Sequence, residues 1–195
     1  MAFIEALTLT GRHARLEPLT LAHHDALTEA ARDGALWQLW YTTVPTPDTM
    51  AAYIDMALAM RSELGALPFV IIDQRDGRIV GCTRYFNVDA TNRRLEIGHT
   101  WLAASAQRSA INTEEKMLLL RHAFEHLRCI AVELRTHFMN HQSRAAIARL
   151  GAKQDGILRN HAIMADGSYR DTVVFSIIES EWPAVRRHLQ FKLDR

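Results

Sequence analysis

The chain has little of what marks a secreted, membrane-bound or nucleic-acid-binding protein. Its only two cysteines, Cys82 and Cys129, lie in apolar stretches without a spaced partner, so we expect core residues in a reducing compartment, not a disulfide framework. A formal net charge of +1 gives no field for nucleic acid or an anionic membrane. No apolar run approaches a membrane span, and charges interrupt the N-terminal stretch where a signal peptide has its apolar core. We therefore expect a cytoplasmic protein.

What the chain does have is enough apolar content, 48% of 195 residues, for one sizeable core and a single domain over residues 1–195. Its apolar spacing alternates between the periods of strands and helices, and Asp-Gly pairs mark two hairpins. The expected strands are 14–18, 69–73, 79–85, 95–102, 129–136, 154–164 and 169–178, and the expected helices are 21–36, 50–64, 112–127, one opened by Asn140, and a closing helix at 180–193. This order predicts a mixed α/β fold with a central, mostly antiparallel sheet flanked by helices.

The strongest functional signal lies in residues 95–151. There a strand leads through a short loop into a helix, and after another strand Asn140 opens a second helix. A strand that enters a helix through a tight loop points backbone N–H groups and the positive helix end at one spot. This region therefore predicts a pocket for a phosphate-bearing ligand.

Several short motifs of this region identify a family. In chain order they are Glu96-Ile97-Gly98, Gln107-Arg108-Ser109-Ala110-Ile111-Asn112, Asn112-Thr113-Glu114, Asn140-x-x-Ser143 and Leu150-Gly151-Ala152. Together with the order of elements from Ala14 to Leu193, they resemble the GNAT acyl-CoA N-acetyltransferases, and within them the RimJ/RimL branch of ribosomal-protein N-terminal acetyltransferases. The resemblance implies the GNAT fold and direct transfer of an acetyl group from acetyl-CoA to a primary amine. The amine would belong to a protein N-terminus or a small molecule.

The resemblance also implies where coenzyme A binds. The family's loop motif is Gln/Arg-x-x-Gly-x-Gly/Ala, and here Ala110 and Asn112 stand at its small positions. Asn112, with Glu115 three residues on, also has the pattern of a helix N-cap, and Glu114 and Glu115 would compete with a phosphate for the helix end. The implied coenzyme-binding residues are Leu102, Gln107, Arg108, Ser109, Ala110, Ile111, Asn112, Thr113, Asn140 and Ser143.

Ser143 is the candidate general acid. Many GNAT enzymes protonate the leaving thiolate with a tyrosine, but no tyrosine occurs between Tyr85 and Tyr169. In the RimL-like branch the Asn-x-x-Ser motif implies that Asn140 contacts the coenzyme and Ser143 supplies the proton. Simple capping of the helix start by these two residues is the alternative.

The general base is less clearly indicated. Some RimL-like enzymes carry a carboxylate at the position that is Ala162 here. Its neighbour His161 is of the residue type that commonly serves as a general base near neutral pH, but strand alternation puts His161 on the opposite face unless a bulge intervenes. Glu96, on the strand beside the coenzyme, is the other candidate, with a purely structural role as its alternative. Both candidates stay open.

Residues 36–50 form the expected loop on the acceptor side. This segment contains Trp37, Trp40 and Tyr41 and is broken by two prolines, which disfavour helix in the preceding residue. In the family this region covers the acceptor site, and loop aromatics often serve binding. Anchoring the loop to the core is the alternative, and it is favoured for Trp37.

Three further properties of the chain bear on metal binding, catalysis and assembly. His122-x-x-Glu125-His126 fits a zinc motif, but ten histidines make chance pairs common and the fold already explains this helix, so we expect no metal. A non-catalytic acyl-CoA-binding module is the alternative to an enzyme, because the loop glycines and the carboxylate at position 162 are missing. A homodimer formed through the sheet or the closing helix stays open.

Overall fold

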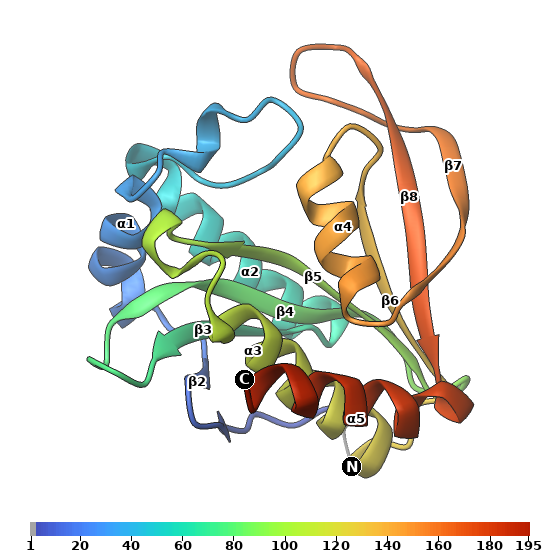
Figure 1. The fold of residues 1–195 in the computed structure, drawn as a ribbon. Helices are drawn as coiled ribbons and strands as arrows, with labels where there is room; N and C mark the ends of the chain where they lie inside the picture. The colour runs from blue at the N-terminus through green and yellow to red at the C-terminus, as the bar shows by residue number, and fades with distance from the viewer. Residues whose placement is uncertain (1–2) are drawn as a thin grey trace.

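The structure is a computed structural model that describes residues 3–195. These residues form one eight-stranded sheet flanked by helices (Figure 1). The strands are β1 (Leu9–Thr10), β2 (Ala14–Pro18), β3 (Leu67–Asp73), β4 (Ile79–Asp89), β5 (Arg94–Leu102), β6 (Ala131–His137), β7 (Lys153–Ile163) and β8 (Tyr169–Ile178), and the helices are α1 (His24–Arg32), α2 (Met50–Leu64), α3 (Ala110–Arg121), α4 (His141–Arg149) and α5 (Trp182–Leu193). Their spatial order in the sheet is β1-β2-β3-β4-β5-β6-β8-β7. The predicted mixed α/β architecture is confirmed.

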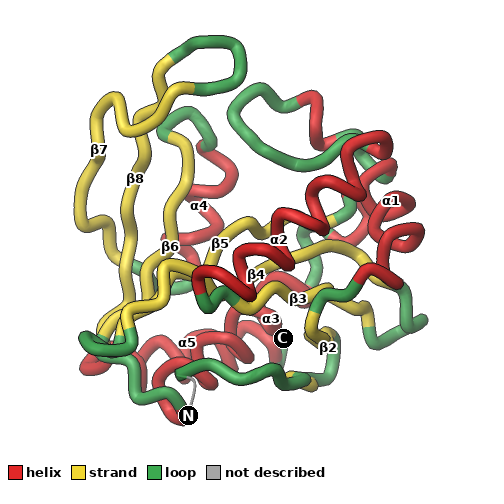
Figure 2. Tube along the Cα trace, turned by 180° about the vertical axis from the view of Figure 1, so that it is seen from behind, coloured by secondary structure: helices red, strands yellow, loops and turns green. Residues whose placement is uncertain are grey.

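The helices cover the two faces of the sheet in two layers. Helices α3, α4 and α5 lie in front of the sheet in Figure 1, and α1 and α2 cover the opposite face, seen in Figure 2. Strand β3 contributes side chains to the apolar cores on both faces, because its side chains alternate. Phe69 and Ile71 belong to the apolar cluster under α3 and α5, and Val70 and Ile72 belong to the cluster under α1 and α2. A strand buried on both faces has a continuous apolar sequence, as β3 has. The two faces are named below by their helices, the α3/α4 face and the α1/α2 face.

One strand pair breaks the antiparallel pattern. Strands β5 and β6 are parallel, and their ladder joins only Arg94–Glu96 to Ala131–Glu133. Beyond that point the two strands diverge (Figure 1). Strand β5 also carries a bulge opposite Thr83, where His99 takes a positive φ of 50°. Bulges bend a strand and redirect its side chains, so the irregular part of the sheet lies where the two strands part.

Two predicted helices have different bounds in the structure. The helix expected over residues 21–36 is a short 3-10 turn followed by α1, which ends at Arg32 because Gly34 (φ 96°) and Ala35 (φ 45°) leave helical geometry. The helix expected from Asn112 begins at Ala110 and continues after Arg121 as one π-helical turn. Within residues 3–195 no helix has the length and apolar character of a membrane span.

Candidate active site

A cleft of about 810 Å³ opens where β5 and β6 part. Its walls come from the diverging ends of both strands, the loop and first turns of α3, the length of α4, the start of β8 and the segment between α1 and α2. It therefore runs through the sheet from the α3/α4 face to the α1/α2 face. The predicted site residues that line it are Tyr41, Leu102, Gln107, Arg108, Ser109, Asn112, Asn140 and Ser143.

The start of α3 forms one end of the cleft. Its N-cap is Ser109, whose hydroxyl accepts from the backbone N–H of Ile111 (3.3 Å) and donates to the carbonyl of Ala106 (2.6 Å). The expectation that Asn112 caps this helix was therefore wrong. Asn112 instead lies in the first turn and lines the cleft. A helix start presents free N–H groups and a partial positive charge, so this end suits an anion.

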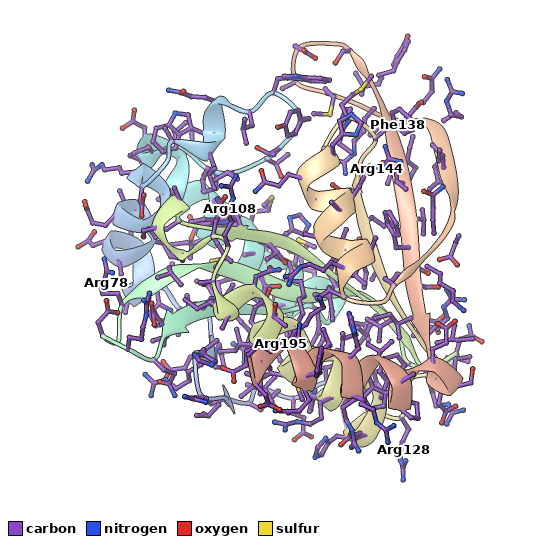
Figure 3. All side chains as sticks on the ribbon, in the orientation of Figure 1. Arg78, Arg108, Arg128, Phe138, Arg144 and Arg195 are labelled. Atoms are coloured by element: carbon purple, nitrogen blue, oxygen red, sulfur yellow. The ribbon has the colours of Figure 1, made fainter. Side chains whose placement is uncertain are left out.

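The two departures from a glycine-rich loop fit the backbone differently. Ala110 is the first residue of α3 and is not among the residues with positive φ, so its methyl group causes no backbone strain. Arg108 has a φ of 56°, in the left-handed region that favours glycine. Figure 3 shows Arg108 on the loop that precedes α3, across the gap from Arg144 on α4. The loop thus holds a cation in a conformation that a glycine would adopt more easily.

The acidic residues of α3 point away from the cleft, against expectation. The carboxylate of Glu114 accepts from the backbone N–H groups of Arg12 (2.9 Å) and Ala14 (2.6 Å), and so holds the turn between β1 and β2. Glu115 is fully buried and pairs with Lys116 at 2.7 Å. Neither carboxylate neutralises the start of α3, which therefore stays available for a negative ligand.

The start of α4 faces α3 across the cleft. Asn140 caps α4 by accepting from the backbone N–H of Ser143 (3.0 Å), so its capping role is real whatever it binds. The Ser143 hydroxyl is half-buried, lines the cleft and makes no hydrogen bond with another residue of the described chain, 3–195. Gln142 donates to the side chain of Gln107 (3.2 Å), which bridges the two helix starts.

The charge along the cleft is of one sign. Its described lining residues include five cations and no carboxylate. Three of them, Arg108, Lys116 and Arg149, come from the elements of the α3/α4 face, and Lys116 is the one already paired with a carboxylate. Arg135 and Arg170 belong to β6 and β8 and lie on the α1/α2 face, as their strand alternation shows. Both ends of the cleft are therefore cationic.

Glu96, one candidate base, lies on the α1/α2 face beside the point where the strands part. It is 4% exposed and lines a smaller adjoining pocket, while Arg135 lines both cavities. Its carboxylate accepts from the Asn87 amide (2.9 Å) and lies 3.4 Å from the Arg135 guanidinium. Burial is the main effect on this carboxyl and raises its pKa, which moves Glu96 towards the range of a base that works near neutral pH.

His161, the other candidate base, lies on a bulge of β7 between Leu158 and Ala162. Its Nδ1 atom lies 3.1 Å from the hydroxyl of Thr172, which also accepts from Arg170 (3.1 Å). The bulge thus turns His161 towards the face of the sheet that carries Arg170. Its side chain is nevertheless exposed and is not one of the cleft-lining residues.

The aromatic residues of the α1–α2 segment separate into two groups. Trp37 packs against the core under α1 and α2 and does not line the cleft, so it anchors the loop. Tyr41 lines the cleft, and the 57% exposed Trp40 lies edge-on to it at 5.6 Å. Trp40 also contacts the ring of His137 at 5.0 Å. His137 is 4% exposed and its Nδ1 accepts from the Met139 backbone N–H (3.0 Å).

Sequence reasoning missed His137, His99 and Arg170. No motif contains them, and each reaches the cleft through a long-range feature of the sheet: the end of β6, the bulge of β5, and a strand that pairs with β6 from the far end of the chain. Burial lowers the pKa of His99 to about 4, and the positive charges of Arg84 and Arg170 add to this effect. His99 is therefore neutral near pH 7.

The His-x-x-Glu-His pattern lies apart from the cleft, in the π-helical turn after α3. The rings of His122 and His126 stack on each other at 5.5 Å, and His122 stacks on Tyr85 at 6.0 Å. Glu125 accepts from the Trp182 indole (2.9 Å) and from Arg186 (3.1 Å). These contacts give the three residues a packing role.

A sheet split at a parallel strand pair, with two helix starts facing each other across a cationic cleft, defines a transferase-like site for a phosphate-bearing donor. Comparison with known proteins gives the family. Residues 13–153 match the family model described as an acetyltransferase (GNAT) domain. The chain therefore belongs to the GNAT acetyltransferase family, whose members use acetyl-CoA, and the predicted fold is confirmed.

Individual relatives agree with this assignment. YdaF of Bacillus subtilis (strain 168), provisionally named a ribosomal N-acetyltransferase, is 32% identical over 107 residues, which are 55% of this chain and 57% of YdaF. The chain thus matches little more than half of that relative's length. A GCN5-related N-acetyltransferase from Brucella melitensis is 31% identical, with a TM-score of 0.86 over 97% of this chain and 86% of that one. YdaF supports the predicted RimJ/RimL-like branch.

A third relative shows the fold with a coenzyme bound. RimJ of Mycobacterium smegmatis, solved in complex with CoA-disulfide, has a TM-score of 0.77 over 96% of this chain and 93% of that one. At 23% identity this similarity concerns the fold alone. It shows that the architecture holds coenzyme A in another protein.

Proposed function

We propose that this protein transfers the acetyl group of acetyl-CoA directly to a primary amine, on a protein N-terminus or a small molecule. The observation that carries the proposal is the cleft itself, whose lining combines two helix starts and three cations on the α3/α4 face with residues of the α1/α2 face. Acetyl-CoA would enter from the first face and the amine from the second. A ribosomal-protein acceptor, as in the name of YdaF, would place the enzyme in the cytoplasm.

The residues present fit the coenzyme. The N–H groups at the start of α3 and the nearby Arg108 would hold the pyrophosphate, because anions bind at helix starts. Leu102 and the rest of the unpaired edge of β5 would face the pantetheine and offer a backbone N–H to the thioester oxygen, and pre-set donors stabilise the charge that develops there. Gln107 is bonded to Gln142 across the cleft, and Asn140 caps α4. These two residues would flank the coenzyme from the α3 side and the α4 side.

Two protons must move for the transfer to occur. Ser143 is the proposed acid, since its hydroxyl lines the cleft and is free to donate to the leaving thiolate, whose pKa as a thiol is about 8.5. Of the two base candidates, Glu96 has the stronger support: it is buried beside the strand junction and burial raises its pKa. It would take the ammonium proton through a water molecule. The exposed His161 stays the alternative base.

Calorimetry followed by an activity assay tests the proposal. Acetyl-CoA is titrated into the protein, and thiol release is then measured with a panel of primary amines, with the corresponding N-acetylated compounds as blocked controls. We expect saturable binding and turnover of at least one free amine. Binding without any turnover would favour the non-catalytic module, and absence of binding would contradict both functions.

A further inference from the structure

The cations of the cleft are not all explained by a coenzyme. Arg108, Lys116 and Arg149 lie on the α3/α4 face, where the phosphates of acetyl-CoA would be neutralised. Arg135 and Arg170 lie on the opposite face, where the donor proposed above would end in a neutral thioester. Any anion that these two arginines bind must therefore come from the protein or from the other substrate.

Only one of the two arginines has a carboxylate partner. Arg135 lies 2.8 Å from Glu133 and 3.4 Å from Glu96. Arg170 forms no ion pair within residues 3–195; its Nε donates to the Thr172 hydroxyl at 3.1 Å. Ala162, its direct partner on β7, offers only a methyl group. The two terminal amino groups of Arg170 are thus free for a ligand in the cleft.

The carboxylates near Arg170 are engaged elsewhere. Glu96, whose charge acts on Arg170, is bound by Arg135 and Asn87. Asp171, the next residue of β8, accepts from Arg159 (2.6 Å) and from the Asn160 backbone (2.8 Å) outside the cleft. Residues 3–195 therefore give Arg170 no carboxylate within ion-pair distance, and Arg170 lies at a half-buried position, where an unpaired cation is costly.

The surroundings add positive charge and donors. Arg84 is 1% exposed on the same face, and the contacts recorded for its guanidinium are to neutral groups: the Met60 sulfur (3.0 Å) and the Tyr53 ring (5.4 Å). The buried Nε2 of His137 has no partner within the described residues. Because Nδ1 of His137 accepts a backbone N–H, the neutral ring carries its proton on Nε2 and can only donate there.

We propose that the acceptor amine carries a carboxylate a few bonds from its nitrogen, and that Arg170 binds this carboxylate with His137 Nε2–H as a second donor. This inference rests on the proposed acetyl transfer and names its substrate class. An acceptor with a second positive charge, such as a polyamine, would be repelled by Arg84 and Arg170. The carboxylate can be that of a free amino acid or the side chain of an acidic first residue in a peptide.

Matched acceptor pairs test the proposal. Rates of thiol release give kcat/KM at saturating acetyl-CoA for a free amino acid and its carboxamide, and for C-terminally amidated peptides that begin with Asp or Asn. Amidation also changes the pKa of the amine. The ratio of kcat/KM for the carboxylate to kcat/KM for the amide is therefore compared between the wild type and Arg170→Gln. We expect the wild-type ratio to exceed that of Arg170→Gln by about tenfold to a hundredfold in one pair, because bonds to charged partners are strong. The pair with the larger excess identifies the source of the carboxylate.

Two further variants separate binding from folding. Ala162→Glu places a carboxylate directly opposite Arg170 on an exposed strand, and we expect it to reduce the ratio as Arg170→Gln does while the amide is still acetylated. Arg159→Gln removes an exposed arginine of the same hairpin that does not line the cleft, and its ratio should match the wild type. Equal ratios in wild type and Arg170→Gln for both pairs would overturn the inference. Turnover of no amine at all would instead overturn the proposed function.

Discussion

The two ends of the cleft recognise charge by different means. On the α3/α4 face, backbone N–H groups at two helix starts, capped by Ser109 and Asn140, add positive potential to that of the cationic side chains. On the α1/α2 face it comes from side chains, chiefly Arg170 and the buried Arg84. Backbone donors suit a ligand part that is common to all family members, whereas single side chains can change without altering the fold. The difference indicates that the coenzyme end is general and the acceptor end is specific to this protein.

The largest effect is expected at Ser143, which lies where the two ends of the cleft meet. Ser143→Ala should lower kcat by about a hundredfold or more, because general acids contribute at least that much. Binding of acetyl-CoA and stability should change little, since the cap of α4 uses the backbone N–H of Ser143. Thiol release at saturating substrates gives kcat, and Ser62→Ala, on the exposed end of α2, is the control. An unchanged kcat would leave Ser143 with a structural role only.

A second test probes the charge of the acceptor end through His99. Its pKa is about 4 in the folded protein, below the ordinary 6.5, so the unfolded chain binds more protons between these values. The free energy of unfolding should therefore fall on acidification from pH 6.5 to 4, with about 1.4 kcal/mol per pH unit from His99.

Urea unfolding at several pH values measures this slope. His99→Gln should make it shallower than in the wild type, whereas Ser62→Ala, an exposed change on α2 that removes no titratable group, should leave it unchanged. Equal slopes in wild type and His99→Gln would show that burial and the neighbouring arginines do not lower the pKa of His99.

The smallest effect is expected at the coenzyme end. Asn112→Asp adds a negative charge at the start of α3, which should weaken acetyl-CoA binding about two- to fivefold while the helix itself is stabilised, because both respond to the helix dipole. Calorimetry measures the loss of affinity for acetyl-CoA, and thermal unfolding measures the gain in stability. Gln154→Glu adds the same charge on exposed β7 and serves as the control. Unchanged affinity in Asn112→Asp would mean that the pyrophosphate lies elsewhere.

Much of the fold could be predicted because its signals are local. The apolar spacing of Met50–Leu64 matches the observed α2, and the turns at Asp76-Gly77 and Asp166-Gly167 lie in the predicted hairpins. The loop ahead of α3 and the Asn140-x-x-Ser143 start of α4 line the cleft as predicted. These features depend on residues that are neighbours in the chain.

What could not be predicted depends on the exact loop geometry or on distant partners. Ser109 and Asn112 are both good capping residues within one turn, and only the bond from the Ile111 backbone N–H to the Ser109 hydroxyl shows that Ser109 is the cap. Glu114 looks like a charge at the helix start, but its partners are about one hundred residues away in the β1–β2 turn. Arg170 belongs to no motif, and its lack of a carboxylate follows from strand register.

The short β5–β6 ladder has a consequence for the mechanics of the molecule. Within the described part of the chain, 3–195, only the segments Arg94–Glu96 and Ala131–Glu133 join the two halves of the sheet by strand pairing. A pantetheine chain lying between the separated strands would act as a substitute strand and tie the halves together. Hydrogen exchange should then slow at residues 97–102 and 134–137 when coenzyme A binds, far more than at the regular β2–β3 pair. In this view the donor completes the sheet of the enzyme that consumes it.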